Sequence, residues 1–167
     1  MCVAFLKEKT MDNLTRIASF SVNHDYITEG IYVSRIDGDI TTYDMRTRVP
    51  NNCEDDYMSN LTMHTFEHLF ATYVRNSEIG TRVIYFGPMG CQTGFYLLVR
   101  NADNGETLEV VKSVLAKIIA HEGRVPGATR VECGNYKNLD LESAKTEAIR
   151  YLGILSSKEN DFKYPEA

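Results

Sequence analysis

Several features that mark specialised classes of protein are missing from this sequence. No apolar run approaches the roughly 18 residues that a membrane-spanning helix needs. There is no basic surplus either, because 18 Lys and Arg residues stand against 23 Asp and Glu residues. Nucleic-acid-binding proteins usually carry such a surplus. Internal repeats, low-complexity tracts and Pro/Gly/Ser-rich linkers are also absent. We therefore expect one globular domain with no nucleic-acid or membrane partner.

The start of the chain does not resemble a secretory signal. Its one apolar stretch covers residues 2–6, and three charged residues follow at once. We therefore expect a cytoplasmic protein, whose four cysteines are thiols or metal ligands rather than disulfides. Residues 1–16 carry no strong pattern and are predicted to be an N-terminal extension, with the domain spanning residues 17–167.

The first half of the chain has the composition of strands. Residues 31–36 and 40–45 are β-branched and aromatic, and they flank Asp37-Gly38-Asp39, a typical hairpin turn. The polar residues 47–58 are expected to form a loop. Two further strands, at 82–86 and 95–100, enclose a Gly-rich turn, and this short connection favours an antiparallel pair.

Three segments have helical periodicity: residues 60–75, 106–121 and 139–152. Asn104 is a candidate N-cap for the second helix and Gly123 a candidate stop. The stretch between the last two helices, residues 125–138, is irregular. Strands mixed with three helices, without βαβ alternation, indicate an α+β fold: an antiparallel sheet with helices packed on one face, in a single domain.

The sharpest chemical motif is His64-Thr65-Phe66-Glu67-His68. On a helix, residues four apart lie on one face, so His64 and His68 can reach one metal ion. Glu67 projects beside them and can reach a proton without being a ligand. This H-x-x-E-H order is the inverse of the zincin motif. The alternative interpretation of the motif is two histidines on one helix face that only make hydrogen bonds and bind no metal.

A catalytic metal site usually has three protein ligands and an open position. Cys133 lies in an irregular Glu-Cys-Gly-Asn segment, where the backbone can turn a thiolate inward, and Cys91 lies in the Gly-rich turn. The residue types alone leave the choice open among five candidates: Cys53, Cys91, Cys133, His24 and His121.

Three segments resemble the signature blocks of the bacterial S-ribosylhomocysteine lyases, which make the autoinducer-2 precursor. They are HTFEHLFA (64–71), GPMGCQTGFY (87–96) and ECGNY (132–136). Two earlier segments, SFSVNH (19–24) and TYDMR (42–46), resemble the substrate-binding segments of that family, in the same order. Metallopeptidases with the same H-x-x-E-H motif lack the second and third blocks.

The resemblance implies a role for each matching residue. His64, His68 and Cys133 match the metal ligands of the family, and Glu67 and Cys91 match its acid/base pair. Three further residues match those that hold the substrate: Ser19, His24 and Arg46. The family converts S-ribosylhomocysteine to homocysteine and 4,5-dihydroxy-2,3-pentanedione by carbonyl migrations and β-elimination.

The same resemblance implies a cofactor and an assembly. The cofactor is one divalent metal per subunit, Fe²⁺ in the first place, with Zn²⁺ or Co²⁺ as alternatives. The assembly is a homodimer whose sites lie at the subunit interface. Two other functions use the same ligands: a metal hydrolase, in which Glu67 activates water, and a non-enzymatic metal-binding module. The second thiol, Cys91, argues against the hydrolase, and the intact pair of Glu67 and Cys91 argues against the module.

Overall fold

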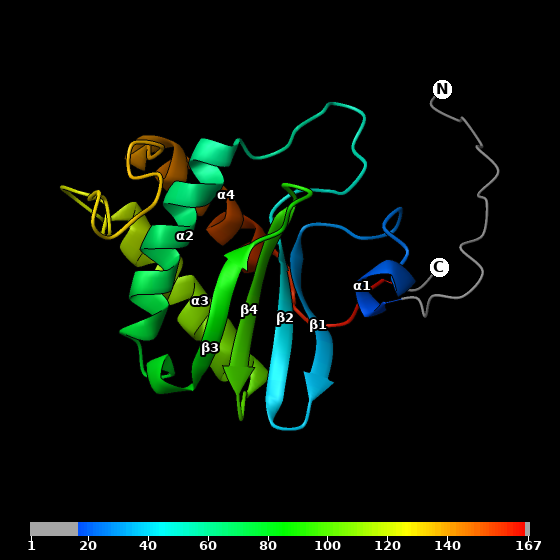
Figure 1. The fold of residues 1–167 in the computed structure, drawn as a ribbon. Coiled ribbons are helices and arrows are strands. Elements are labelled where there is room, and N and C mark those ends of the chain that lie inside the picture. Colours follow the sequence, from blue (N-terminus) through cyan, green and yellow to red (C-terminus); the bar gives the residue numbers. More distant parts are fainter. Residues whose placement is uncertain (1–16, 166–167) are drawn as a thin grey trace.

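Four antiparallel strands form the centre of the structure, a computed structural model that describes residues 17–165 (Figure 1). The strand order across the sheet is β1-β2-β4-β3. The strands are β1 (Gly30–Asp37), β2 (Ile40–Arg46), β3 (Val83–Pro88) and β4 (Gly94–Arg100). The hairpin expected around Gly38 is confirmed, and Gly38 has a φ of 60°, a left-handed value that glycine adopts without strain.

Side-chain alternation gives the sheet two different faces. Tyr43 and Met45 of β2 pair with Leu97 and Phe95 of β4, and all four are buried against the helices. The intervening side chains point the other way. We call that side the open face; it is formed by Thr42, Asp44, Arg46, Tyr96 and Leu98.

Three helices cover the first of these faces (Figure 1). They are α2 (Asn60–Arg75), α3 (Asn104–Ile119) and α4 (Leu141–Ser157). A short helix, α1 (Ala18–Ser21), lies beside the β1 edge, and the one-turn 3₁₀ helix η1 (Gly80–Arg82) precedes β3. The predicted α+β class, with helices packed on one face of an antiparallel sheet in one domain, is therefore confirmed.

The predicted bounds of the last two helices, 106–121 and 139–152, were wrong at both ends. The N-cap of α3 is Asp103, whose side chain accepts a hydrogen bond from the Glu106 amide; Asn104 is the first helical residue and accepts from the Tyr43 hydroxyl instead. The same helix ends at Ile119, two residues before the predicted end at residue 121. The last helix starts after its cap, Asp140, and runs five residues beyond the predicted end, to Ser157.

An aromatic stack fixes α2 to the sheet. The rings of Phe66 and Phe95 stack with centroids 4.8 Å apart, and those of Phe70 and Phe86 with centroids 4.2 Å apart. All four side chains are buried. Such stacked rings combine a large buried area with a defined orientation, so the helix that carries His64 and His68 is held at a fixed position over β3 and β4.

The chain after α4 returns along the edge strand β1. The Val33 amide donates to the Phe162 carbonyl at 2.8 Å, and the Tyr164 ring stacks on Tyr32. No helix among residues 17–165 is both long and apolar enough to cross a bilayer. The expected extension, residues 1–16, lies outside the described residues.

Candidate metal centre and acid/base residues

His64, His68 and Cys133 converge on one point. Their ligand atoms all lie within 4.8 Å of one another, and the Nε2 of His64 is 3.3 Å from the Cys133 sulfur. The two histidines come from successive turns of α2. The cysteine comes from the irregular segment between α3 and α4, so the fold brings together the three residues that the resemblance selected.

Backbone carbonyls orient both imidazoles. The Nδ1 of His64 lies 2.8 Å from the Asn138 oxygen, and the Nδ1 of His68 lies 2.7 Å from the Pro126 oxygen. A carbonyl oxygen can only accept, so each Nδ1 donates its hydrogen, and each Nε2 is the ring nitrogen left to bind a metal. Histidines that bind metals are usually held in this way.

The segment that carries Cys133 is shaped by short-range contacts. The amides of Glu132 and Cys133 both donate to the Thr129 carbonyl, and the Asn135 amide donates to the Cys133 sulfur at 3.4 Å. Gly127 lies against the His68 ring, where a Cβ atom would be 2.9 Å from Nδ1. Glycine there lets the backbone approach the imidazole.

This donor set fits a divalent transition metal. Two neutral imidazole nitrogens and one thiolate sulfur are typical ligands of zinc and iron, whereas Ca²⁺ and Mg²⁺ prefer oxygen. Three protein ligands leave a coordination position for a substrate or water. All three side chains are half-buried, so the cluster is reachable from solvent.

Glu67 adjoins the cluster without belonging to it. It lines a cavity of about 230 Å³ together with His64, Pro88 of β3 and Asn138. The cavity therefore gives a molecule near the metal ligands access to the Glu67 carboxylate. That placement suits a group that moves protons and does not bind the metal.

Cys91 and Arg46 are also brought together. The exposed Cys91 thiol lies 3.0 Å from the Thr93 hydroxyl and 3.9 Å from the Arg46 Nη1 atom. Arg46 itself is 3% exposed, and its Nη1 donates to the Thr93 hydroxyl at 2.5 Å. The Arg46 guanidinium therefore places a positive charge beside the Cys91 sulfur.

Asp44 supplies the counter-charge for Arg46. Its nearer oxygen, Oδ1, lies 2.8 Å from the Arg46 Nε atom without accepting a hydrogen bond from any described residue, whereas Oδ2 accepts one from that nitrogen at 3.1 Å. Burial raises the pKa of Asp44, and the Arg46 charge opposes that rise. The pair is thus a buried, directly neutralised ion pair.

The turn that carries Cys91 is hydrogen-bonded to the loop that follows β2. The amides of Thr47 and Arg48 donate to the Thr93 carbonyl at 3.0 and 3.1 Å, and the Met58 amide donates to the Gln92 carbonyl. Both ends of the loop of residues 47–58 therefore contact the turn, at the adjacent residues Gln92 and Thr93.

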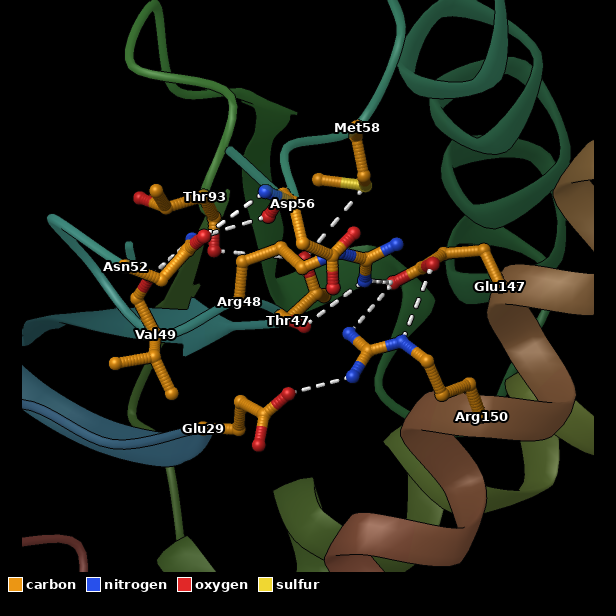
Figure 2. Close-up of polar contacts among 10 residues, drawn as sticks. All are labelled: Glu29, Thr47, Arg48, Val49, Asn52, Asp56, Met58, Thr93, Glu147 and Arg150. Carbon is orange, nitrogen blue, oxygen red and sulfur yellow. Dashed lines mark hydrogen bonds and ion pairs between the residues drawn. The ribbon is translucent and has the colours of Figure 1, made fainter. Parts of the chain in front are cut away.

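Ion pairs tie that loop to α4 (Figure 2). Arg48 donates to Glu147 at 2.7 Å, and Arg150 bridges Glu147 and Glu29. Glu147 is 3% exposed. Sequence reasoning missed this network; the only local signal was the three-residue spacing of Glu147 and Arg150 on a helix, because Arg48 is 99 residues away from Glu147.

Ser19 and His24 are the other two residues expected to hold the substrate, and His24 lies near enough to Asp44 to lower the pKa of that carboxyl. Ser19 of α1 lines a pocket over the open face with Thr42, Tyr85 and Tyr96. The His24 ring lies 3.0 Å from the Val22 carbonyl. Within residues 17–165, neither side chain forms a hydrogen bond with Arg46, Cys91 or the three clustered ligands.

The donor set and the cavity beside Glu67 define a candidate metalloenzyme. A family model described as S-ribosylhomocysteinase (LuxS) matches residues 17–161, and the chain belongs to that family. It is 40% identical to the S-ribosylhomocysteine lyase of Borrelia garinii subsp. bavariensis over 159 residues, which cover 91% of this chain and 100% of the relative. The S-ribosylhomocysteine lyase of Finegoldia magna is also 40% identical, over 92% of this chain and 100% of the relative.

Glu147→Gln should destabilise the fold. The change leaves Arg48 and Arg150 facing a neutral amide in a buried position, and removing one partner of a buried pair costs about 3 kcal/mol. Urea denaturation measures this loss. Glu109→Gln is the control, because Glu109 forms an exposed pair with Lys112 at the same three-residue spacing; its effect should stay within about 0.5 kcal/mol. Equal losses in the two variants would contradict the assignment.

Proposed function

We propose that the protein is an S-ribosylhomocysteine lyase, which cleaves S-ribosylhomocysteine to homocysteine and 4,5-dihydroxy-2,3-pentanedione. The observation that carries the proposal is the convergence of His64, His68 and Cys133 within 4.8 Å, in a chain that matches the family over residues 17–161. The decisive experiment is release of homocysteine thiol from S-ribosylhomocysteine by the purified protein.

His64, His68 and Cys133 would hold one divalent ion per subunit, with Fe²⁺ as the first choice and Zn²⁺ or Co²⁺ as alternatives. When bound, the ion would supply Lewis acidity toward a sugar carbonyl. The two oriented Nε2 atoms and the thiolate support this assignment. The site depends on reduced thiols, and Cys53, Cys91 and Cys133 are free thiols in the structure, which supports the cytosol as its compartment.

Cys91 and Glu67 would divide the proton transfers. The Cys91 thiolate removes a carbon-bound proton and returns it to the neighbouring carbon, which moves the carbonyl along the sugar. Glu67 transfers protons in the second migration and in the elimination that releases the homocysteine thiolate. The support is positional: Arg46 lies beside the Cys91 sulfur, and Glu67 lines the cavity next to His64.

The substrate contacts would come from Ser19, His24 and Arg46, within a homodimer whose sites lie at the interface. Arg46 already uses its Nε and Nη1 atoms inside the subunit, so Nη2 is the atom left for a substrate carboxylate. Ser19 lies over the open face, which also presents the half-exposed Tyr85 ring. A second subunit covering this face would make Ser19 and His24 available to its site.

Cys133→Ala should lose the metal, because two histidines alone form an incomplete ligand set. Elemental analysis of the purified variant measures the metal content per chain. Cys53→Ala is the matched control, since Cys53 is an exposed thiol outside the cluster, and it should keep a full complement. Full metal content in Cys133→Ala would remove that residue from the ligand set.

Cys91→Ala and Glu67→Gln should each reduce kcat by about 100- to 10,000-fold, the usual contribution of one general acid/base. Metal content should stay unchanged, because neither side chain belongs to the cluster of ligand atoms. Homocysteine release measures the rate. A Cys91→Ala enzyme with near wild-type turnover would end this mechanism.

Tyr85→Glu should dissociate the homodimer, because it places a charge beside Tyr96 and Leu98, the apolar part of the open face. Analytical ultracentrifugation should give twice the 18.9 kDa mass of one chain for the wild type and a single chain mass for the variant. Ile149→Glu, an exposed change on α4, should leave the dimer intact. A wild-type monomer with full activity at the assay concentration would refute the assembly.

A further inference from the structure

The Asp44–Arg46 pair lies on a side of the sheet that α2, α3 and α4 do not cover. Its side chains alternate along β2 with Tyr43 and Met45, which face the helices. Open faces of antiparallel sheets are usually solvated. Asp44 is nevertheless 1% exposed and Arg46 3% exposed, so another part of the chain must shield them from water.

The segment that follows α4 provides part of that shield. The Tyr164 hydroxyl donates to the Asp44 Oδ2 atom at 2.7 Å, and the Tyr164 ring stacks on Tyr32 with centroids 5.0 Å apart and an interplanar angle of 16°. The bond from the Val33 amide to the Phe162 carbonyl anchors the same segment to β1. Burial, followed by the Asp44 charge, raises the pKa of Tyr164 far above its usual value, so its hydroxyl stays a donor.

Tyr164 connects to Cys91 through two ion-paired side chains. Asp44 Oδ2 accepts from both Tyr164 and Arg46, and Arg46 reaches the Thr93 hydroxyl and the Cys91 sulfur. The other oxygen of Asp44 has no hydrogen-bond donor among the described residues. Without the Tyr164 hydroxyl, the buried carboxylate would keep Arg46 as its one donor in the described chain, and its position would be less defined.

We propose that Tyr164 is a positioning residue of the acid/base site: it fixes Asp44, and through Asp44 it holds Arg46 beside the Cys91 sulfur. The residue follows position 161, where the family match ends, so the family pattern does not assign it. The effect of Tyr164 on catalysis rests on the proposed lyase function. The effect of Tyr164 on the reactivity of the Cys91 thiol is independent of that function.

Tyr164→Phe tests the proposal, because it removes one hydroxyl and keeps the ring that stacks on Tyr32. The rate of Cys91 alkylation by iodoacetamide at neutral pH, followed by mass spectrometry of the Cys91 peptide, should fall about tenfold, since a less fixed guanidinium keeps its positive charge less closely beside the reacting sulfur. Lyase kcat should fall by a similar factor, about 1.4 kcal/mol, with KM changed less than threefold and metal content unchanged. An unaltered alkylation rate would overturn the proposal.

Tyr73→Phe is the matched control. It removes a hydroxyl that makes a hydrogen bond of the same 2.7 Å length, but to His121. That bond is not connected to Asp44, Arg46 or Cys91 by any hydrogen bond among the described residues. This variant should alkylate Cys91 and turn over substrate at the wild-type rate. If it slowed both as much as Tyr164→Phe, the loss would be general and the specific role of Tyr164 would be refuted.

A double-mutant cycle tests the route. If Tyr164 acts through Asp44, adding Tyr164→Phe to Asp44→Asn should slow alkylation no further than Asp44→Asn alone. A second tenfold loss in the double variant would contradict that route. A wild-type protein without lyase activity would defeat the proposed function, and the alkylation rates would still decide the role of Tyr164.

Discussion

Two hydrogen bonds from histidine rings to backbone carbonyls determine where the metal-binding atoms lie. The segment between α3 and α4 contains no helix or strand, yet it must present the Cys133 sulfur at a defined point. His64 binds the Asn138 carbonyl and His68 binds the Pro126 carbonyl, so the ligand helix holds this segment on both sides of the cysteine. The same two bonds occupy each Nδ1 and direct each Nε2 toward the thiol. Orientation of two ligands and placement of the third therefore have a common cause.

The sheet places the proton-transfer groups relative to that centre. On its covered face, stacked phenylalanines lock α2 over β3 and β4. On its open face, β2 directs the Asp44–Arg46 pair toward the turn that carries Cys91. Pro88, at the end of β3, lines the cavity beside Glu67, and Thr93, just before β4, contacts Arg46. The β3–β4 turn thus adjoins both chemical groups, and a rigid hairpin sets their separation.

Sequence periodicity predicted which residues share a helix face. It did not predict the features that tertiary contacts determine, such as helix caps and the third metal ligand. The helical spacing of His64, Glu67 and His68 was sufficient to place them together on α2. Asp103 and Asn104 are equivalent caps by residue type, and the contact of Asn104 with Tyr43 distinguishes them only in the folded chain. The third ligand stayed open among five residues because the path of an irregular segment leaves no periodic signal; the family resemblance selected Cys133. The partners Tyr164 and Asp44 are 120 residues apart, beyond any spacing argument.

Two arginines with carboxylate partners meet at the Cys91 turn, and stability alone does not account for them. Replacing a buried ion pair by well-packed apolar residues is often neutral or stabilising, because two charges must be desolvated. Arg46 contacts Thr93 through its side chain, and Arg48 contacts the same residue through its backbone amide. Asp44 restrains the first arginine and Glu147 restrains the second. Hydrogen-bonded ion pairs fix the orientation of a side chain as well as its distance from a partner, and apolar packing fixes orientation less well. Their convergence on one short turn therefore fits a requirement to hold the thiol of Cys91 in one place.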